Sequence, residues 1–312
     1  MNKKDKIYIA GHSGMVGSAI LRKLTSEGYG NILTISHNDL DLTQQTKTFD
    51  FIKDNKPDYI VIAAAHVGGI KENKEHPAQL LYENMMINAN IMQAAHEVGV
   101  KKLMVLGSSC IYPRECKQPI TEDEFLAGKP EPTNQGYSIG KIAALEMAKY
   151  YNLQYHDCFI NCMPTNIYGV NDNFDLNASH VIPAMIRKYH EAKIQNKTSV
   201  TSWGTGKPLR EFMYVDDLAD AILFLMQNYE DSETINIGTG EEVSIKQLNE
   251  EICNIVGYSG KLEWDTTKPD GNPRKLLDCS KIQKLGWHSK TSLKDGLEKT
   301  YKYFIDIRGE NK

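Results

Sequence analysis

The first 24 residues contain the pattern that most restricts the fold of this 312-residue chain. A short apolar run at residues 6–10 is followed by Gly11, Gly14 and Gly17, and then by residues 18–24, whose apolar side chains have helical spacing. A strand, a glycine turn and a helix in this order form the unit that binds a dinucleotide in α/β domains. The glycines let the backbone approach a pyrophosphate at the N-terminus of the helix. An ordinary strand-to-helix turn has the same order, so the rest of the chain must decide between the two interpretations.

The alternation of strand and helix patterns continues beyond this unit. Further apolar runs predict buried strands at residues 31–36, 59–65, 102–106 and 158–163. Helical patterns separate them at 46–53, 78–98 and in the alanine-rich segment 141–148. Alternating strands and helices predict an α/β fold with a Rossmann-type, doubly wound parallel sheet.

Four of the expected strand ends carry glycine-rich or polar sequences, at 11–17, 65–69, 107–113 and 164–169. Ligands bind beyond the carboxyl ends of the strands in such sheets. We therefore expect these four segments to converge on one crevice.

The second half has a looser pattern, with expected strands near 199–203, 211–215 and 234–238. It contains no repeat and no low-complexity linker. We expect a cofactor-binding domain of residues 1–168 with about 212–238, and a smaller interleaved α/β lobe of residues 169–211 and 239–312 that binds the substrate.

Composition and charge exclude several classes of protein. The net charge of −4 comes from interspersed acidic and basic residues, which argues against nucleic acid as a partner. The longest apolar stretches are too short to cross a membrane, and the N-terminus has no signal-peptide pattern. The six cysteines form no C-x-x-C pair, which indicates reduced thiols in a cytoplasmic protein. The nine histidines form no cluster with ligand spacing, so we expect no metal site.

Tyr137 and Lys141 are candidates for acid–base chemistry. Four residues apart in a helical segment, they lie one turn apart on the same face. A free phenol titrates near ~10, and an ammonium about 4 Å away could bring it toward neutral pH. The same spacing occurs by chance in many helices, so it needs support from the rest of the chain.

Together these features resemble the extended short-chain dehydrogenase/reductase family, and within it the bifunctional epimerase/reductases of GDP-4-keto-6-deoxy sugars. The resemblance covers nearly the whole chain. Besides the glycine turn and the Tyr137–Lys141 pair, its most specific stretches are 107–113, 163–166, 177–183, 210–212 and 268–275.

The resemblance implies an NADPH-dependent enzyme that performs 3,5-epimerisation and 4-reduction of GDP-4-keto-6-deoxy-D-mannose to GDP-L-fucose. It assigns Cys110 as the base and His180 as the acid of epimerisation, with Tyr137 protonating the carbon-4 alkoxide. Ser108 would hydrogen-bond the carbonyl, and Lys141 would hold the nicotinamide ribose and lower the pKa of Tyr137. Thiol and imidazole pKa values bracket neutral pH, which suits these roles. Taken alone, the cysteine is equally typical of core packing and the histidine of a helix cap.

NADP is the expected cofactor, with NAD possible. The second strand ends without an acidic residue, which permits a 2′-phosphate. The arginines that hold this phosphate in relatives are replaced here by Ser13 and His37. The resemblance assigns cofactor binding to Gly11, His12, Ser13, Gly14, Met15, Val16, Gly17, His37, Asp41, Leu106, Gly107, Ser108, Ser109, Lys141, Pro164, Thr165, Asn166, Ile167 and His180.

The nucleotide half of the substrate is assigned by the resemblance to Lys188, Trp203, Arg210 and Asp270. The cations suit a pyrophosphate, and Trp203 offers a flat wall unless it simply packs in the core. A homodimer through helices 78–98 and 138–151 is expected from the same resemblance. Two alternative functions stay open: an epimerase/reductase or a reductase of another GDP-4-keto sugar, such as a 6-deoxy-heptose, and a nucleotide-binding regulator without turnover.

Overall fold

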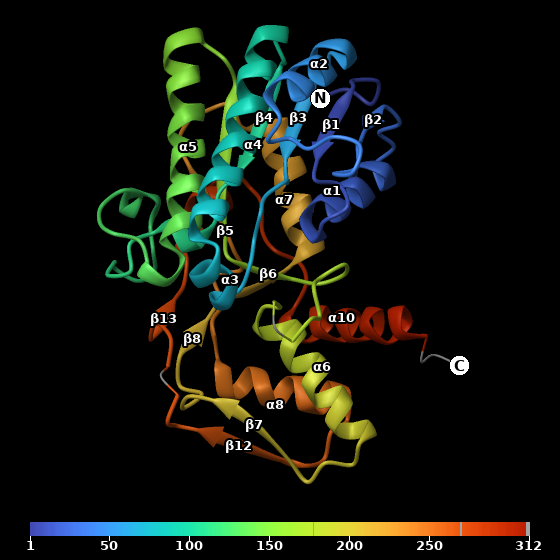
Figure 1. Cartoon of the computed structure of the whole chain (residues 1–312), viewed down its shortest axis with the longest axis vertical. Helices are drawn as coiled ribbons and strands as arrows, with labels where there is room; N and C mark the ends of the chain where they lie inside the picture. Colours follow the sequence, from blue (N-terminus) through green and yellow to red (C-terminus); the bar gives the residue numbers. More distant parts are fainter. Residues whose placement is uncertain (177, 269, 310–312) are drawn as a thin grey trace.

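A computed structural model describes residues 1–176, 178–268 and 270–309 of the chain. Figure 1 shows a larger lobe built on a parallel sheet and a smaller lobe below it. Two of the stretches that carry the resemblance, 177–183 and 268–275, each include one residue outside the described part, Asn177 and Pro269.

The larger lobe contains a six-stranded sheet in the order β10-β5-β4-β3-β1-β2. All neighbouring strands are parallel, which confirms the predicted doubly wound α/β fold. The strands are β1 (Ile7–Ala10), β2 (Ile32–Leu33), β3 (Tyr59–Ile62), β4 (Lys102–Leu106), β5 (Phe159–Pro164) and β10 (Ile235–Ile237).

Helices cover both faces of this sheet (Figure 1). On one face α4 (Pro77–Val98) packs between α2 (Gln45–Asn55) and α5 (Gln135–Tyr155), and α3 (Ile70–Glu75) precedes it. On the other face α1 (Met15–Ser26) packs against α7 (Val215–Asn228). Short 3₁₀ turns at Ser109–Ile111, Glu122–Glu124 and Pro132–Asn134 lie in the connection between β4 and α5.

The central strands consist of uninterrupted apolar runs because both of their faces are covered. Every residue of β1, β3, β4 and β5 is buried. The second strand is shorter than the predicted 31–36 and ends at Leu33, with a turn following at residue 37. It lies at the edge of the sheet and pairs only with β1, so fewer ladder hydrogen bonds hold it.

The glycine turn after β1 requires glycine at two of its positions. Gly11 has φ +83°, and an added Cβ would lie 2.6 Å from the Ala64 backbone. A Cβ on Gly17 would lie 2.1 Å from the carbonyl oxygen of Gly11, so α1 can approach β1 this closely only without a side chain there. The turn therefore fixes the start of α1 directly above the end of β1.

The smaller lobe has its own apolar core, around α6 (Val181–Ile194), α8 (Ile245–Val256) and α10 (Leu293–Arg308). Its short strands are β7 (Ser199–Trp203) paired with β12 (Lys261–Asp265), and β8 (Leu209–Arg210) between β11 (Val243–Ser244) and β13 (Arg274–Lys275). A parallel pair, β6 (Asn166–Tyr168) and β9 (Phe212–Tyr214), joins the two lobes.

The chain crosses between the two cores several times, as the predicted interleaving requires. The segment around the short helix α9 (Ser280–Lys284), which we assigned to the substrate lobe, places Leu277, Ile282 and Trp287 in the core of the larger lobe. The predicted domain boundaries themselves stay a prediction.

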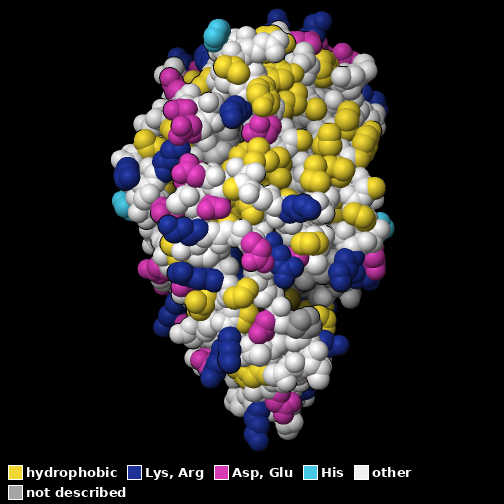
Figure 2. Space-filling model, turned by 90° about the vertical axis from the view of Figure 1, so that its left-hand side faces the viewer, with side chains coloured by type: hydrophobic (Ala, Val, Ile, Leu, Met, Phe, Trp, Pro, Cys, Tyr) yellow, Lys and Arg dark blue, Asp and Glu magenta, His cyan; other side chains and the backbone are white. Residues whose placement is uncertain are grey.

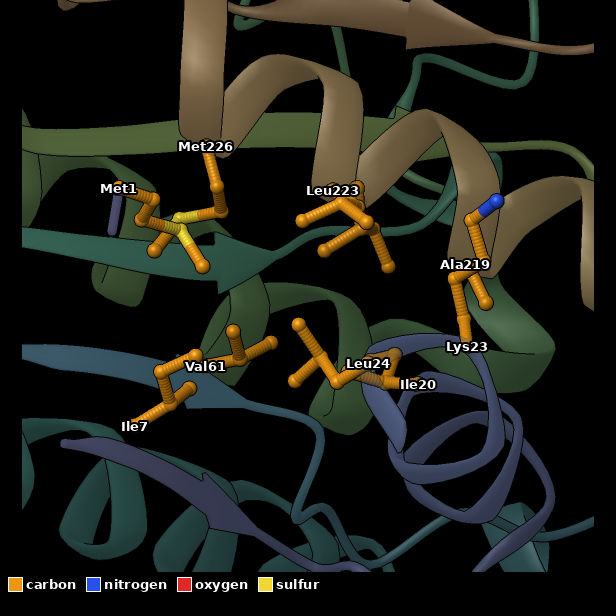
Figure 3. A pocket seen from close by; sticks show the side chains of 10 residues that line it. Met1, Ile7, Ile20, Lys23, Leu24, Val61, Ala219, Leu223 and Met226 are labelled. Atoms are coloured by element: carbon orange, nitrogen blue, oxygen red, sulfur yellow. The ribbon is translucent and has the colours of Figure 1, made fainter. Parts of the chain in front are cut away.

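A small apolar cavity lies inside the larger lobe between α1, α7 and the sheet (Figure 3). Ile20, Leu24, Val61 and Leu223 are among the side chains around it, and Lys23 is the charged residue at its edge. Its apolar lining offers almost no hydrogen-bonding partners, so we regard it as imperfect packing rather than a ligand site. Among the described residues no helix is both long enough and apolar enough to span a bilayer.

Candidate active site

A cleft of about 650 Å³ opens at the carboxyl ends of the central strands. Its walls include residues from all four polar strand ends that the sequence singles out, at 14–16, at 65, 67 and 68, at 107–110 and at 164–168. The predicted convergence on one crevice is therefore confirmed. The volume is typical of a site for a small-molecule ligand or cofactor.

The N-terminus of α1 faces this cleft without a side chain to cap it. Gly14 is the N-cap residue and makes no side-chain hydrogen bond to the first turn, and Met15 and Val16 line the cleft. Free backbone N–H groups at a helix N-terminus attract anions. A loop from the other lobe secures the turn, because Asn171 donates a 2.7 Å hydrogen bond to the Ser13 carbonyl. This arrangement fits the diphosphate of a dinucleotide.

Tyr137 and Lys141 both line the cleft from α5, but they do not pair in the way that the sequence suggests. The Lys141 ammonium is buried and donates a 2.8 Å hydrogen bond to the carbonyl oxygen of Leu106. Burial lowers the pKa of Lys141 to about 8. Burial also raises the pKa of Tyr137, with the Cys110 thiol contributing and a hydrogen bond from Ser108 opposing the shift. This is opposite to the expected lowering by Lys141, and it keeps the phenol protonated at neutral pH.

Ser108 and Cys110 stand at the end of β4, where the chain turns into a 3₁₀ helix. Ser108 caps this turn, accepting a 3.2 Å hydrogen bond from the Cys110 backbone N–H. The Ser138 hydroxyl donates to the Cys110 carbonyl at 3.2 Å, which ties the turn to α5. Burial raises the pKa of the Cys110 thiol, but the charges of Lys275 and Arg210 and a hydrogen bond with Ser108 outweigh it and leave the pKa lowered. A thiol in this environment can act as a base near neutral pH.

His180 also lines the cleft, as the N-cap residue of α6. Its ring is open to the water of the cleft, yet the surrounding protein lowers its pKa. A lowered pKa reduces the fraction of imidazolium at pH 7 and makes each imidazolium a stronger acid. His180 thus occupies the helix-cap position that its alternative interpretation expected.

The predicted cofactor residues divide into two groups. Lining the cleft are Gly14, Met15, Val16, Leu106, Gly107, Ser108, Ser109, Lys141, Pro164, Thr165, Asn166, Ile167 and His180. Gly11, His12, Ser13, Gly17, His37 and Asp41 are outside its lining. Gly11 and Gly17 act through the backbone of the turn, and Ser13 and His37 are exposed. Asp41 binds the backbone N–H and the hydroxyl of Thr43, at 2.9 and 2.7 Å.

The four predicted substrate residues all lie in the smaller lobe, outside the lining of the cleft. Trp203 is 73 % exposed, so the alternative of core packing is wrong, and Lys268 lies 5.8 Å from its ring. Lys188 donates to the Thr201 carbonyl of β7, and Asp270 accepts hydrogen bonds from Thr205 at 2.8 and 2.6 Å.

Arg210, the remaining member of this group, extends from β8 toward the cleft. Its charge lowers the pKa of Asp270, after the larger effect of the Thr205 hydrogen bonds, and also that of Cys110. Arg210 therefore links the exposed group around Trp203 to the cleft.

Lys275 is a residue near Cys110 to which the sequence assigned no role. Its ammonium lies 3.4 Å from the Cys110 sulfur and donates a hydrogen bond to it. The residue belongs to the stretch 268–275 that carries the resemblance, so its position was marked, but nothing in the sequence indicated its partner.

Comparison with known proteins agrees with this geometry. The model of the NAD dependent epimerase/dehydratase family matches residues 7–238, which is more than half of the chain. The chain belongs to this family. The match confirms the resemblance to extended short-chain dehydrogenase/reductases. Cofactor binding by the glycine turn itself stays a prediction.

Several of the similar proteins are named for reactions of GDP-sugars. GDP-L-fucose synthase 1 of Arabidopsis thaliana is 50 % identical over 97 % of this chain and 94 % of its own. A solved GDP-L-fucose synthetase of Naegleria fowleri bound to NADP has a TM-score of 0.93 at 29 % identity, covering 99 % of this chain and 95 % of its own. MlghC, a GDP-mannoheptose C4 reductase of Campylobacter jejuni with NADP bound, has a TM-score of 0.90 at 38 % identity, covering 97 % of this chain and 99 % of its own.

Proposed function

We propose that this chain converts GDP-4-keto-6-deoxy-D-mannose to GDP-L-fucose, by epimerisation at carbons 3 and 5 and NADPH-dependent reduction at carbon 4. The observation that carries the proposal is that one cleft holds a reductase set, Tyr137 with Ser108 and Lys141, together with Cys110 and His180. Reduction alone needs neither the thiol nor the imidazole. The 50 % identity to a protein named GDP-L-fucose synthase supports the choice of substrate.

Epimerisation begins at the carbons next to the ketone, whose hydrogens the carbonyl acidifies. The Cys110 thiolate takes the proton from such a carbon, and His180 returns a proton to the other face of the sugar. Ser108 donates its hydroxyl hydrogen to the carbonyl oxygen, where negative charge develops. The lowered pKa of Cys110 increases the fraction of base that is ready at neutral pH.

Reduction at carbon 4 needs a hydride, which the nicotinamide supplies when bound. Tyr137 then donates its phenolic proton to the carbon-4 oxygen. The raised pKa of Tyr137 keeps this proton in place until the alkoxide forms. Lys141 is anchored on the Leu106 carbonyl, and its remaining ammonium hydrogens would hold the nicotinamide ribose.

We propose NADP as the preferred cofactor, although family membership itself implies only a nicotinamide dinucleotide. Two similar solved structures contain NADP, and no carboxylate stands at the end of β2 to repel a 2′-phosphate. Ser13 and His37 are exposed and leave room for the 2′-phosphate, but neither position supplies an arginine to bind it. We therefore expect a modest preference, with NADH also accepted.

A second candidate is the epimerisation and reduction, or the reduction alone, of another GDP-4-keto sugar. The likeness to a GDP-mannoheptose C4 reductase favours it. A reductase that does not epimerise would leave Cys110 and His180 without a task. Likewise, a regulator that binds the nucleotide without turnover would have no use for Tyr137 and Lys141.

We propose that the chain forms a homodimer through α4 and α5. Large apolar side chains are exposed along these helices, with Tyr82 at 59 %, Tyr150 at 54 % and Leu153 at 72 %. Figure 2, which views the side of the molecule that α5 forms in Figure 1, shows hydrophobic side chains gathered over its upper part. Exposed apolar groups in such number are typical of an interface. Localisation in the cytoplasm stays a prediction.

The test is turnover by the purified chain. With GDP-4-keto-6-deoxy-D-mannose and NADPH in deuterium oxide, we expect loss of NADPH absorbance and, by NMR, GDP-L-fucose carrying deuterium at carbons 3 and 5. Reduction without deuterium at these carbons would support the reductase alternative. Turnover of a GDP-4-keto heptose in place of this substrate would show that the proposed sugar is wrong, and binding of NADPH without turnover of either would support the regulator.

A further inference from the structure

We propose that Lys275 is the positioning residue that holds Cys110 as a thiolate, so that the base of epimerisation is assembled from both lobes of the protein. This inference rests on the proposed function for the role of Cys110, but the ion pair itself can be measured without substrate or cofactor. The sequence separates the two residues by 165 positions, and the fold brings their charged atoms within 3.4 Å.

The backbone around Lys275 is firmly placed. Lys275 belongs to β13 and pairs in parallel register with Arg210 of β8. The next residue, Leu276, accepts a 2.8 Å hydrogen bond from the Ile120 N–H and donates a 2.9 Å bond to Gln118. The ammonium is therefore held at the sulfur by a short strand that is fixed on both sides, rather than by a free loop.

Lys275 has no carboxylate partner among the described residues, whereas its neighbour does. Arg274 forms a 2.7 Å ion pair with Glu242. The side chains of adjacent strand residues point to opposite faces, which separates the two cations. The positive charge of Lys275 is therefore available to stabilise a thiolate at Cys110.

The other groups that face Cys110 support the same conclusion. Arg210 adds a second positive charge from β8, and the Ser108 hydroxyl hydrogen-bonds the sulfur from the end of β4. Tyr137 faces it from α5 and stays neutral at pH 7 because its pKa is raised. Around Cys110 the nearby charges are therefore positive, and no described carboxylate opposes them there.

Cys110 also differs from the other cysteines, all six of which lie in the described part of the chain. The pKa of the remaining five is raised by burial: Cys116, Cys158, Cys162, Cys253 and Cys279. Cys110 alone among them has a lowered pKa, and its side chain is half-buried at the wall of the cleft. A thiol reagent at neutral pH should therefore react with Cys110 first.

The proton balance of the proposed step is simple. The thiol proton of Cys110 leaves to water before the substrate binds, and Lys275 stays protonated throughout. The thiolate then accepts the carbon proton and becomes a thiol, which returns this proton to water. Lys275 itself transfers no proton, so it changes how much base is present rather than the chemistry of the step.

The experiment measures alkylation of Cys110 by iodoacetamide as a function of pH, with the modified cysteine identified by mass spectrometry. The sulfur forms a bond to carbon and iodide leaves, so the rate follows the thiolate fraction. The half-point is the pH at which the alkylation rate is half of its maximum. In the wild-type protein we expect this pH to lie below that of an ordinary thiol. In Lys275→Met we expect it to rise by roughly one pH unit or more, which lowers the rate at neutral pH about tenfold.

Three variants make the measurement specific. Lys275→Arg keeps the charge and should keep the low half-point. Arg274→Met removes the same charge one residue away and should leave the half-point unchanged, since that charge is paired with Glu242. Cys110→Ser gives the background from the other five thiols.

An unchanged half-point in Lys275→Met, or an equal rise in Arg274→Met, would overturn the inference. So would a wild-type half-point at or above that of a free thiol, a result that does not depend on whether any variant folds. Absence of GDP-sugar turnover would refute the proposed function while leaving the alkylation result valid. With turnover present, Lys275→Met should slow deuterium exchange about tenfold at neutral pH and slow reduction of pre-epimerised substrate less.

Discussion

Lys141 donates its 2.8 Å hydrogen bond to the carbonyl oxygen of Leu106, across the gap between α5 and the end of β4. The lysine is therefore anchored to the sheet, and the phenol of Tyr137 is held protonated by its buried surroundings. A protonated phenol is the form that a proton donor needs. In the proposed reaction, Lys141 would bind and position the cofactor, and Tyr137 would donate the proton.

Tyr137→Phe should abolish reduction and spare epimerisation. We expect NADPH oxidation to fall by ~10² to 10⁴, because no other group in place protonates the carbon-4 oxygen. Deuterium exchange at carbons 3 and 5 should persist, since Cys110 and His180 are untouched. Cys110→Ala is the matched variant and should show the opposite, with reduction of pre-epimerised substrate retained and exchange lost. Equal loss of both activities in both variants would contradict the division of roles.

Lys141→Met should stabilise the protein at neutral pH while abolishing activity. Burial lowers the pKa of Lys141 from 10.5 to about 8, so the unfolded chain binds this proton more tightly than the folded one. Below pH 8 this pKa difference means that the buried ammonium destabilises the folded wild type by about 3 kcal/mol. The substitution removes this cost, but it also removes the hydrogen bond to Leu106, which contributes about 1 kcal/mol. Urea unfolding at pH 7 should show a gain of roughly 2 kcal/mol.

The gain in Lys141→Met should also depend on pH. Between about 8 and 10.5 the folded wild-type lysine is neutral while the unfolded one still binds its proton, so the wild type becomes more stable as the pH rises. The difference between variant and wild type should therefore shrink over this range. A variant that is less stable than wild type at pH 7 would show that the buried ammonium is not a cost to the fold.

Ser13→Arg should strengthen the preference for NADPH. Ser13 is exposed in the turn between β1 and α1, so an arginine there can reach a 2′-phosphate and pair with it. We expect the ratio of kcat/KM for NADPH over NADH to rise about tenfold. Thr25→Arg, which adds the same charge at the exposed far end of α1, should leave the ratio unchanged. A similar rise in both variants would mean that net charge, and not the position of Ser13, decides the preference.

Leu153→Asp should give a monomer. Leu153 is 72 % exposed on α5, and a charge there would be buried without a partner in the proposed interface. Light scattering after gel filtration should show the mass halved relative to wild type. Ile307→Asp, at a position 54 % exposed on α10, should leave the mass unchanged. A wild-type protein that already runs as a monomer would refute the interface.

Much of the larger lobe is predictable from the sequence because its elements obey local rules. Residues 59–62 form a central strand because this run of apolar side chains must be covered on both faces of the sheet. An edge or surface position would leave one of these faces exposed to water. Gly11 and Gly17 identify the turn, since a side chain at either position would collide with the backbone. The second strand was predicted too long because an edge strand with one neighbour ends where its pairing ends.

The smaller lobe is less predictable, since its strands are too short to show a periodicity. β8 and β13 have two residues each, and only their pairing makes them strands. The exposure of Trp203 likewise depends on where β7 lies, and an isolated tryptophan in a sequence is equally typical of a core.

By itself the sequence determined the parallel sheet, the glycine turn and the meeting of polar strand ends at one edge, because spacing and burial along a short segment fix each of these. Only the tertiary structure decided which charges meet there. Lys141 binds Leu106 instead of acting on Tyr137, and Lys275 reaches Cys110 from a strand 165 residues away. The physical reason is that ionic contacts depend on distances across the fold, which the packing of both lobes sets and no local pattern records.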